Sequence, residues 1–241
     1  MRKLYFLCGG GCNRFEVTDF VHYLDEEITV IELPGHGLEK ETQLANLDDL
    51  VAWFGQKIDP ESDIILIAHS MGANLAPYLA TQIPAIKQLI LLDGGYYDFD
   101  ALMSLDDEIA DTKSYFEQMN FDRLEDFVEM SRADAPYWSE HLEQAAQASV
   151  YLTRDGHYQL NMVEDTFLTL LGLQRACQGF LTQVICNTVL IPQTVDCPDW
   201  KTAMLEAIPA YITIDSQLFC GHSPHTECPE KLAKVVRTYL V

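Results

Sequence analysis

DIILIAHSMGANLAPYLA, residues 63–80, decides the fold of this chain. The apolar run at its start predicts a buried strand, and the residues after Ser70 predict a helix. Small residues, Ala68 and Gly72, flank the serine across the turn. A serine in such a strand-turn-helix junction has its Oγ held exposed above the end of a sheet. The match to G-x-S-x-G is complete except that Ala68 stands at the first glycine position. The stretch therefore predicts a parallel α/β fold and a reactive serine together.

Composition limits the class of protein. The chain has 241 residues, of which 48% are hydrophobic, enough for one large α/β domain with an insertion. Its formal charge of −22 would repel nucleic acids and anionic membranes, so we expect neither as a partner. No apolar run approaches the ~20 residues of a membrane span. The seven scattered cysteines are an odd number, which favours free thiols and a cytoplasmic protein.

Apolar runs alternate with helical patterns over residues 3–92 and again over residues 188–240. One of the helical patterns covers residues 41–58. Strands that are apolar throughout are typical of a parallel sheet covered on both faces. The alternation therefore predicts a doubly wound, mostly parallel sheet.

The pattern changes between the two alternating regions. Residues 96–180 are acidic and helical, with one hairpin predicted at residues 151–160 and no strand for the main sheet. We therefore expect a core made of residues 1–95 and 186–241. An inserted helical cap, residues 96–185, would lie over it.

A serine nucleophile needs a base within hydrogen-bond reach. His222 is the predicted base, because its loop follows the last strand and so lies at the same edge of the sheet as Ser70. His225 in the same loop is a rival, which we interpret as shaping the loop.

The base needs a carboxylate that fixes its tautomer. Asp196 is the predicted acid, because it follows the strand that ends at Ile191. Asp93, after the preceding core strand, is the alternative, and Asp199 is a weaker candidate. Each also fits a turn aspartate, so the choice depends on position alone.

Backbone N–H groups are the predicted oxyanion donors. One belongs to Met71, the residue after the nucleophile. The other belongs to Gly10 in the glycine loop 8–11, where the missing side chains permit close approach. No Gly-Lys-Ser/Thr follows this loop, which argues against a phosphate-binding loop.

With these motifs in order, the chain resembles small, cap-bearing serine esterases and lipases of the α/β-hydrolase fold. The resemblance is carried by residues 7–10, 33–37, 68–72, Asp196 and residues 221–230. It implies a sheet of about six strands, the order serine, acid, histidine, and acyl transfer without a cofactor or metal. Cys8 stands where the family often has a histidine that holds the oxyanion loop, which puts the role of Gly10 in doubt.

The resemblance implies a carboxylesterase-like enzyme for a small to medium apolar ester or thioester. Five aromatic side chains are candidates to line its pocket, although each fits cap packing equally well: Tyr96, Tyr97, Tyr137, Trp138 and Phe167. The alternatives are carbon–carbon bond hydrolysis or a lyase reaction on the same triad, or a ligand-binding protein with weak turnover. A homodimer is compatible with the sequence.

Soft ligand residues also cluster near the C-terminus: Cys220, His222, His225 and Cys228. Such residues bind zinc, but these four fall within nine positions and no second pair accompanies them. We therefore expect no metal site, and His222 is already assigned as the base.

Overall fold

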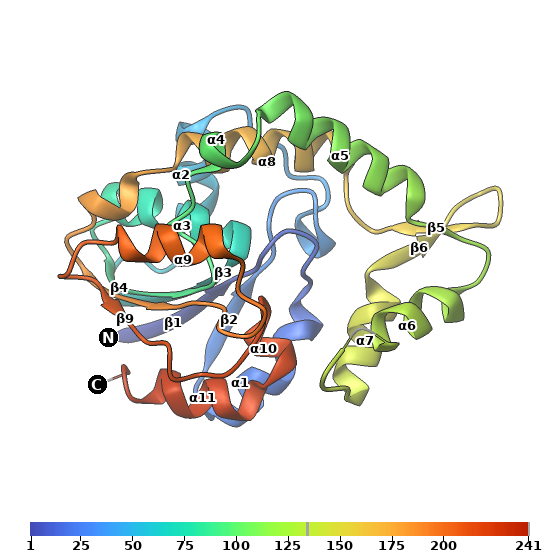
Figure 1. Ribbon diagram of the computed structural model, residues 1–241. Helices are drawn as coiled ribbons and strands as arrows, with labels where there is room; N and C mark the ends of the chain where they lie inside the picture. The colour runs from blue at the N-terminus through green and yellow to red at the C-terminus, as the bar shows by residue number, and fades with distance from the viewer. Residues whose placement is uncertain (134, 241) are drawn as a thin grey trace.

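The computed structural model describes residues 1–133 and 135–240, and within them a parallel sheet is covered on both faces by helices (Figure 1). Its strands, from one edge to the other, are β2 (Ile28–Ile31), β1 (Arg2–Leu7), β3 (Asp63–His69), β4 (Ile86–Leu92), β8 (Asn187–Ile191) and β9 (Thr213–Ile214). Every neighbouring pair is parallel. The predicted doubly wound sheet of about six strands is confirmed. No helix in the described residues is long and apolar enough to cross a bilayer.

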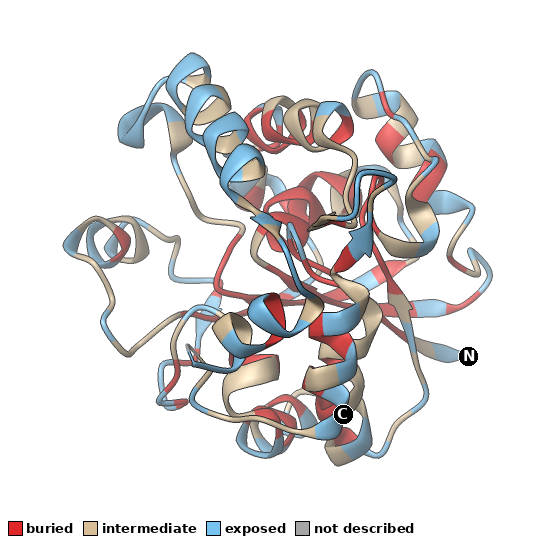
Figure 2. Cartoon of the chain, turned by 90° about the vertical axis from the view of Figure 1, so that its right-hand side faces the viewer, coloured by how far each residue is buried: buried red, intermediate tan, exposed pale blue. Residues whose placement is uncertain are grey.

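The helices form two layers (Figure 1). One layer holds α1 (Thr18–Leu24) and α11 (Pro229–Arg237); the other holds α2 (Leu47–Gly55), α3 (Ser70–Gln82), α8 (Glu164–Ala176) and α9 (Asp199–Glu206). Side chains of β3 alternate between them, since Leu66 packs with the α2–α3 layer and Ile67 with the α1–α11 layer. Both are fully buried, as Figure 2 shows for the centre of the sheet. Burial on both faces explains why the strands are apolar throughout.

The junction between β3 and α3 is crowded. Ser70 has φ of 49°, a left-handed conformation that is strained for a residue with a side chain. A β-carbon on Gly72 would lie 2.4 Å from the carbonyl oxygen of Cys8, and one on Gly94 would lie 2.5 Å from that of Ser70. Ala68 is fully buried and its methyl group is accommodated. The turn therefore requires glycine at Gly72 and accepts alanine at position 68.

Residues 105–160, within the segment between β4 and β8, form a lobe that extends to the right of Figure 1. Its elements are α5 (Leu105–Gln118), β5 (Asn120–Phe121), α6 (Leu124–Ala133), α7 (Glu140–Ala148), β6 (Val150–Leu152) and β7 (Tyr158–Leu160), preceded by α4 (Phe99–Leu102). The hairpin predicted at residues 151–160 is present as β6 and β7, and β5 adds a third antiparallel strand. The lobe has its own apolar cluster around Phe127 and Val150.

Helix α8 differs from the rest of the predicted cap. Its residues Leu170, Leu171 and Leu173 pack into the main apolar layer with α2 and α3.

The helix predicted over residues 41–58 starts later than its apolar spacing indicates. Asn46 caps it by accepting the N–H of Asp49 at 3.0 Å, so α2 begins at Leu47.

We expect Gly72→Ala to lower the free energy of unfolding by about 1–3 kcal/mol, because its methyl group meets two backbone carbonyls. Gly172→Ala in α8 is the control, since no neighbouring atom lies within 4 Å of a β-carbon there. That change should stabilise the protein by about 0.5–1 kcal/mol through helix propensity. Urea denaturation measures both, and an unchanged stability for Gly72→Ala would contradict the crowded-turn account.

Candidate active site

Three side chains form a hydrogen-bonded chain at the carboxyl edge of the sheet. The Oγ of Ser70 lies 2.9 Å from Nε2 of His222, and Nδ1 of His222 lies 2.5 Å from Oδ2 of Asp93. Ser70 starts α3, His222 lies in the loop after β9, and Asp93 follows β4 directly. Because a carboxylate only accepts, Nδ1–H donates to it and Nε2 is left to accept the serine proton. The structure thus brings Ser70 and His222 together as the sequence predicts.

The choice of Asp196 as the acid is corrected by this geometry. Asp196 is exposed, and its backbone carbonyl accepts a 3.4 Å hydrogen bond from Gln193. Asp93, the alternative, is fully buried and is the carboxylate bonded to His222. Strands β4 and β8 are neighbours in the sheet, so the residues that follow both strands lie near the histidine loop. Chain position could not distinguish them, whereas the buried partners of Asp93 do.

Asp93 is held by a dense set of donors. Lys201 on α9 contacts Oδ2. The hydroxyl of Tyr96 donates to Oδ1 at 2.9 Å, and the backbone N–H of Gln193 donates to the same oxygen at 3.2 Å. Lys201 also donates to the side-chain oxygen of Gln193 at 2.6 Å. The hydroxyl of Tyr97 donates to the backbone carbonyl of Asp93 at 3.0 Å. Tyr96 and Tyr97, two of the residues predicted to line the substrate pocket, therefore bond Asp93, and neither is among the residues that line the cavity described below.

These contacts decide the charge of Asp93. Burial alone would raise the pKa of its carboxyl, but hydrogen bonds from His222 and Lys201, with the charge of Lys201, hold that pKa well below its usual range. The buried carboxylate therefore stays ionised. Burial and the nearby Asp93 charge raise the pKa of both Tyr96 and Tyr97, so both remain hydroxyl donors.

Two further histidines lie behind the catalytic loop. His69 donates through Nε2 to the backbone carbonyl of His222 at 3.0 Å. This hydrogen bond ties the loop that carries His222 to the end of β3. The ring of His69 packs on that of His225, with centroids 4.5 Å apart. Burial lowers the pKa of His69 well below its usual value and that of His225 to about 3, so both rings are neutral. His225, the rival base, is 1% exposed and makes no hydrogen bond to Ser70.

The glycine loop closes on the serine from the other side. A β-carbon on Gly9 would lie 3.1 Å from the Cβ of Ser70, and one on Gly10 would lie 2.9 Å from the ring of Phe167. The side chain of Met71 is 3.4 Å from the same point on Gly10. No acceptor for the Gly10 N–H occurs among the described residues, and the Met71 N–H belongs to the unpaired first turn of α3. Both predicted donors are thus free for a ligand.

His36 is a site residue that the sequence analysis missed. Its Nδ1–H donates to the carbonyl of Pro34 at 2.9 Å, and its Nε2 accepts the N–H of Gly11 at 3.0 Å. Burial lowers the pKa of His36, which keeps the ring neutral and able to accept. It therefore holds the glycine loop although Cys8 replaces the family histidine. Residues 33–37 help to carry the family resemblance in the sequence, but that resemblance assigned no role to His36.

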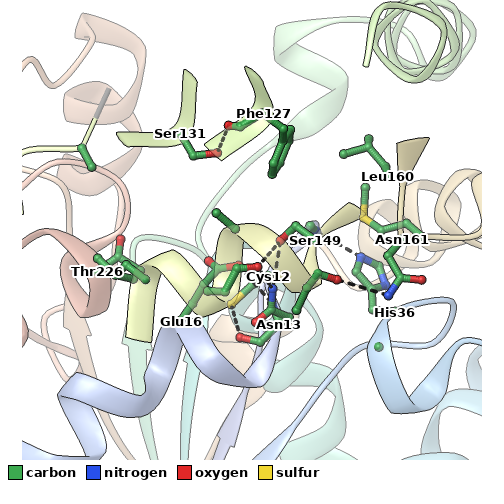
Figure 3. A pocket seen from close by; sticks show the side chains of 18 of the residues that line it. Cys12, Asn13, Glu16, His36, Phe127, Ser131, Ser149, Leu160, Asn161 and Thr226 are labelled. Carbon is green, nitrogen blue, oxygen red and sulfur yellow. Dashed lines mark hydrogen bonds between the residues drawn. The ribbon is translucent and has the colours of Figure 1, made fainter. Parts of the chain in front are cut away.

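A cavity of about 270 Å³ lies between the glycine loop and the lobe. Figure 3 shows Cys12, Asn13 and Glu16 on its floor, with Phe127 and Ser131 across from them. Ser70 and His222 are not among its described lining residues, but Gly11 and Thr226 are. The cavity therefore adjoins the site through the glycine loop. The candidate reaction centre is therefore identified by the hydrogen-bonded chain of Asp93, His222 and Ser70, and not by the cavity.

The other three predicted pocket residues are divided between different roles. Trp138 lines the cavity, and Phe167 covers Gly10. Tyr137 lies against Asp19, with its hydroxyl 3.4 Å from the carboxylate, and so ties the lobe to α1. Sequence spacing could not separate these roles, because all are aromatic residues of one insertion.

A family model described as "Alpha/beta hydrolase family" matches residues 4–235. The chain belongs to this family. The match covers nearly the whole hydrolase-like arrangement described above and confirms the resemblance seen in the sequence. A search of curated protein sequences found no match.

Solved structures show the same fold at low sequence identity. An esterase from Mycobacterium tuberculosis is 19% identical with a TM-score of 0.72, covering 99% of this chain and 85% of that one. A thioesterase domain from the curacin biosynthetic pathway is 20% identical with a TM-score of 0.69, covering 98% and 91%. E-2-(acetamidomethylene)succinate hydrolase is 15% identical with a TM-score of 0.71, covering 100% and 92%. These similarities establish the architecture of the chain.

The buried ion pair of Asp93 and Lys201 predicts a specific acid sensitivity. The folded state binds the Asp93 proton more weakly than the unfolded chain, where the carboxyl titrates near ~3.9. The pair therefore stabilises the fold above that pH, and its contribution is lost as the pH falls below it. We expect the free energy of unfolding to fall more steeply below pH 4 in the native protein than in Asp93→Asn/Lys201→Met. Equal slopes in urea denaturation from pH 5 to pH 2 would contradict this.

Proposed function

We propose that this hydrolase-family protein is a serine hydrolase that cleaves a carboxylic ester or thioester. Ser70 is the nucleophile, His222 the base and Asp93, in place of Asp196, the acid. The observation that carries the proposal is the continuous hydrogen-bonded chain from Asp93 through His222 to Ser70. This geometry is what nucleophilic acyl transfer requires.

The proposed reaction has two halves. His222 takes the proton of Ser70 as Oγ attacks the substrate carbonyl, and the N–H groups of Gly10 and Met71 stabilise the oxyanion. The carbonyl then re-forms, the alcohol or thiol leaves with the proton from His222, and an acyl-serine remains. Water, deprotonated by His222, attacks the acyl group, and collapse of that intermediate releases the acid and Ser70 with its proton.

Lys201 gives this triad a modified electrostatic balance. Lys201 is 5% exposed, and its ammonium group shares Oδ2 of Asp93 with His222. Part of the carboxylate charge is therefore neutralised before the imidazolium forms. We propose that Lys201 positions Asp93 for its hydrogen bond to His222.

The cavity supports an apolar substrate group of small to medium size. Its lining is mostly apolar, with Phe127, Trp138 and Leu160 contributed by the lobe. A volume of about 270 Å³ suits a short acyl or alcohol chain better than a long lipid. Phe167 beside Gly10 would direct that chain past the oxyanion loop.

The proposed nucleophile is tested with a fluorophosphonate probe and a panel of p-nitrophenyl esters and acyl thioesters of increasing chain length. We expect the probe to label the native protein at Ser70, and expect Ser70→Ala to lose both labelling and turnover, because Ser70 carries the one hydroxyl among the described residues that is hydrogen-bonded to the His222 ring. Turnover should decline for long acyl chains. A native protein that is neither labelled nor active would favour the ligand-binding alternative.

The proposed acid is tested by comparing two aspartates. Asp93→Asn should lower kcat by roughly 10³–10⁴-fold through loss of the correct imidazole tautomer, whereas Asp196→Asn should stay within about threefold of the native value. Asp93→Asn leaves Lys201 buried and unpaired, which threatens the fold by about 3–5 kcal/mol. Asp93→Asn/Lys201→Met removes that charge and should be folded yet equally inactive. A larger loss in Asp196→Asn would return the role to Asp196.

A further inference from the structure

A second group of reactive side chains lies at the floor of the cavity. The Sγ of Cys12, a carboxylate oxygen of Glu16 and a ring nitrogen of His225 all lie within 4.8 Å of one another. Cys12 follows the glycine loop, Glu16 lies in η1 (Arg14–Val17), and His225 lies in α10 (Pro224–Glu227). None of the three bonds to Ser70, Asp93 or His222, so the proposed reaction leaves this group unused.

The spacing of these atoms matches a metal site. The Sγ of Cys12 lies 3.8 Å from Nε2 of His225. A tetrahedral zinc ion with a Zn–S distance of about 2.3 Å and a Zn–N distance of about 2.0 Å holds these atoms roughly 3.5 Å apart. Small side-chain shifts would therefore bring both atoms into ligand range. Cys12 and Glu16 both line the cavity, so water can reach a fourth position (Figure 3).

No basic side chain pairs with this group. One oxygen of Glu16 accepts the backbone N–H of Asn13 at 3.1 Å, and no ion pair to Glu16 occurs among the described residues. Arg14, the nearest basic residue in the chain, pairs with Glu32 instead. His225 is 1% exposed, and its Nδ1 has no hydrogen-bond partner in the described part of the chain. A thiol, a carboxyl group and an imidazole with no basic side chain among them form a donor set suited to a cation.

We propose that Cys12, Glu16 and His225 bind a thiophilic divalent transition-metal ion such as Zn²⁺, with water from the cavity as the fourth ligand. This set departs from the expectation of no metal site, and it shares only His225 with the C-terminal cluster considered in the sequence. The bound ion bridges the glycine loop and the segment that carries His222. It is separate from Ser70, and its binding is independent of the proposed reaction.

The test uses the purified full chain under reducing conditions, titrated with Co²⁺ and then with Zn²⁺. Co²⁺ bound by a thiolate has a charge-transfer absorption in the near ultraviolet. We expect one equivalent to produce this band and Zn²⁺ to abolish it by displacement. The measurement needs no substrate, so it is unaffected if the proposed function fails.

Variants assign the ligands. Cys12→Ser should lose the band, and Glu16→Gln should keep it but weaken Co²⁺ binding at least tenfold. Gln preserves the capping hydrogen bond to Asn13, so this variant keeps the local fold. Cys177→Ser, at a buried thiol in the other apolar layer, is the control and should bind as the native protein does. No band in the native protein, or a band that persists in Cys12→Ser, would overturn the proposal.

Discussion

A charged carboxylate buried at the end of a parallel strand requires partners, and Asp93 has them on every side. His222, Lys201 and Tyr96 come from three different parts of the chain; His222 and Lys201 donate to Oδ2 of Asp93, and Tyr96 donates to Oδ1. Removing any one partner leaves the remaining buried charge less compensated. The side chain of Asp93 therefore links the positions of α9, the loop after β4 and the loop that carries His222.

That constraint extends to the reacting atom through the backbone. Two hydrogen bonds hold His222: its Nδ1 bonds to Asp93, and its backbone carbonyl accepts from His69. Its Nε2 therefore faces Ser70. The serine is held by the crowded turn at Gly72, and His36 fixes the glycine loop opposite it. The lobe lines one side of the cavity, and its residues make none of these contacts.

Much of this was predictable from the sequence because local pattern and topology agree. The apolar run before Ser70 and the alternation of elements define the sheet, and they place His222 at the correct edge. The proposed role of Asp93 was not predictable, because Asp93 and Asp196 both follow strands that are neighbours in the sheet. What separates them is burial beside Lys201, a contact across 108 residues that no local pattern records. The hydrogen bond between His36 and Gly11 joins residues 25 positions apart, so the motif around His36 alone did not predict its role at the glycine loop.

The most direct measurement of the central claim is the proton NMR spectrum of the imidazole N–H groups in the resting protein. A strong hydrogen bond from Nδ1 of His222 to a buried carboxylate shifts that proton far downfield. The account predicts such a resonance in the native protein and in Asp196→Asn, and its loss in Asp93→Asn/Lys201→Met. A resonance that survives in the double variant and disappears in Asp196→Asn would contradict it.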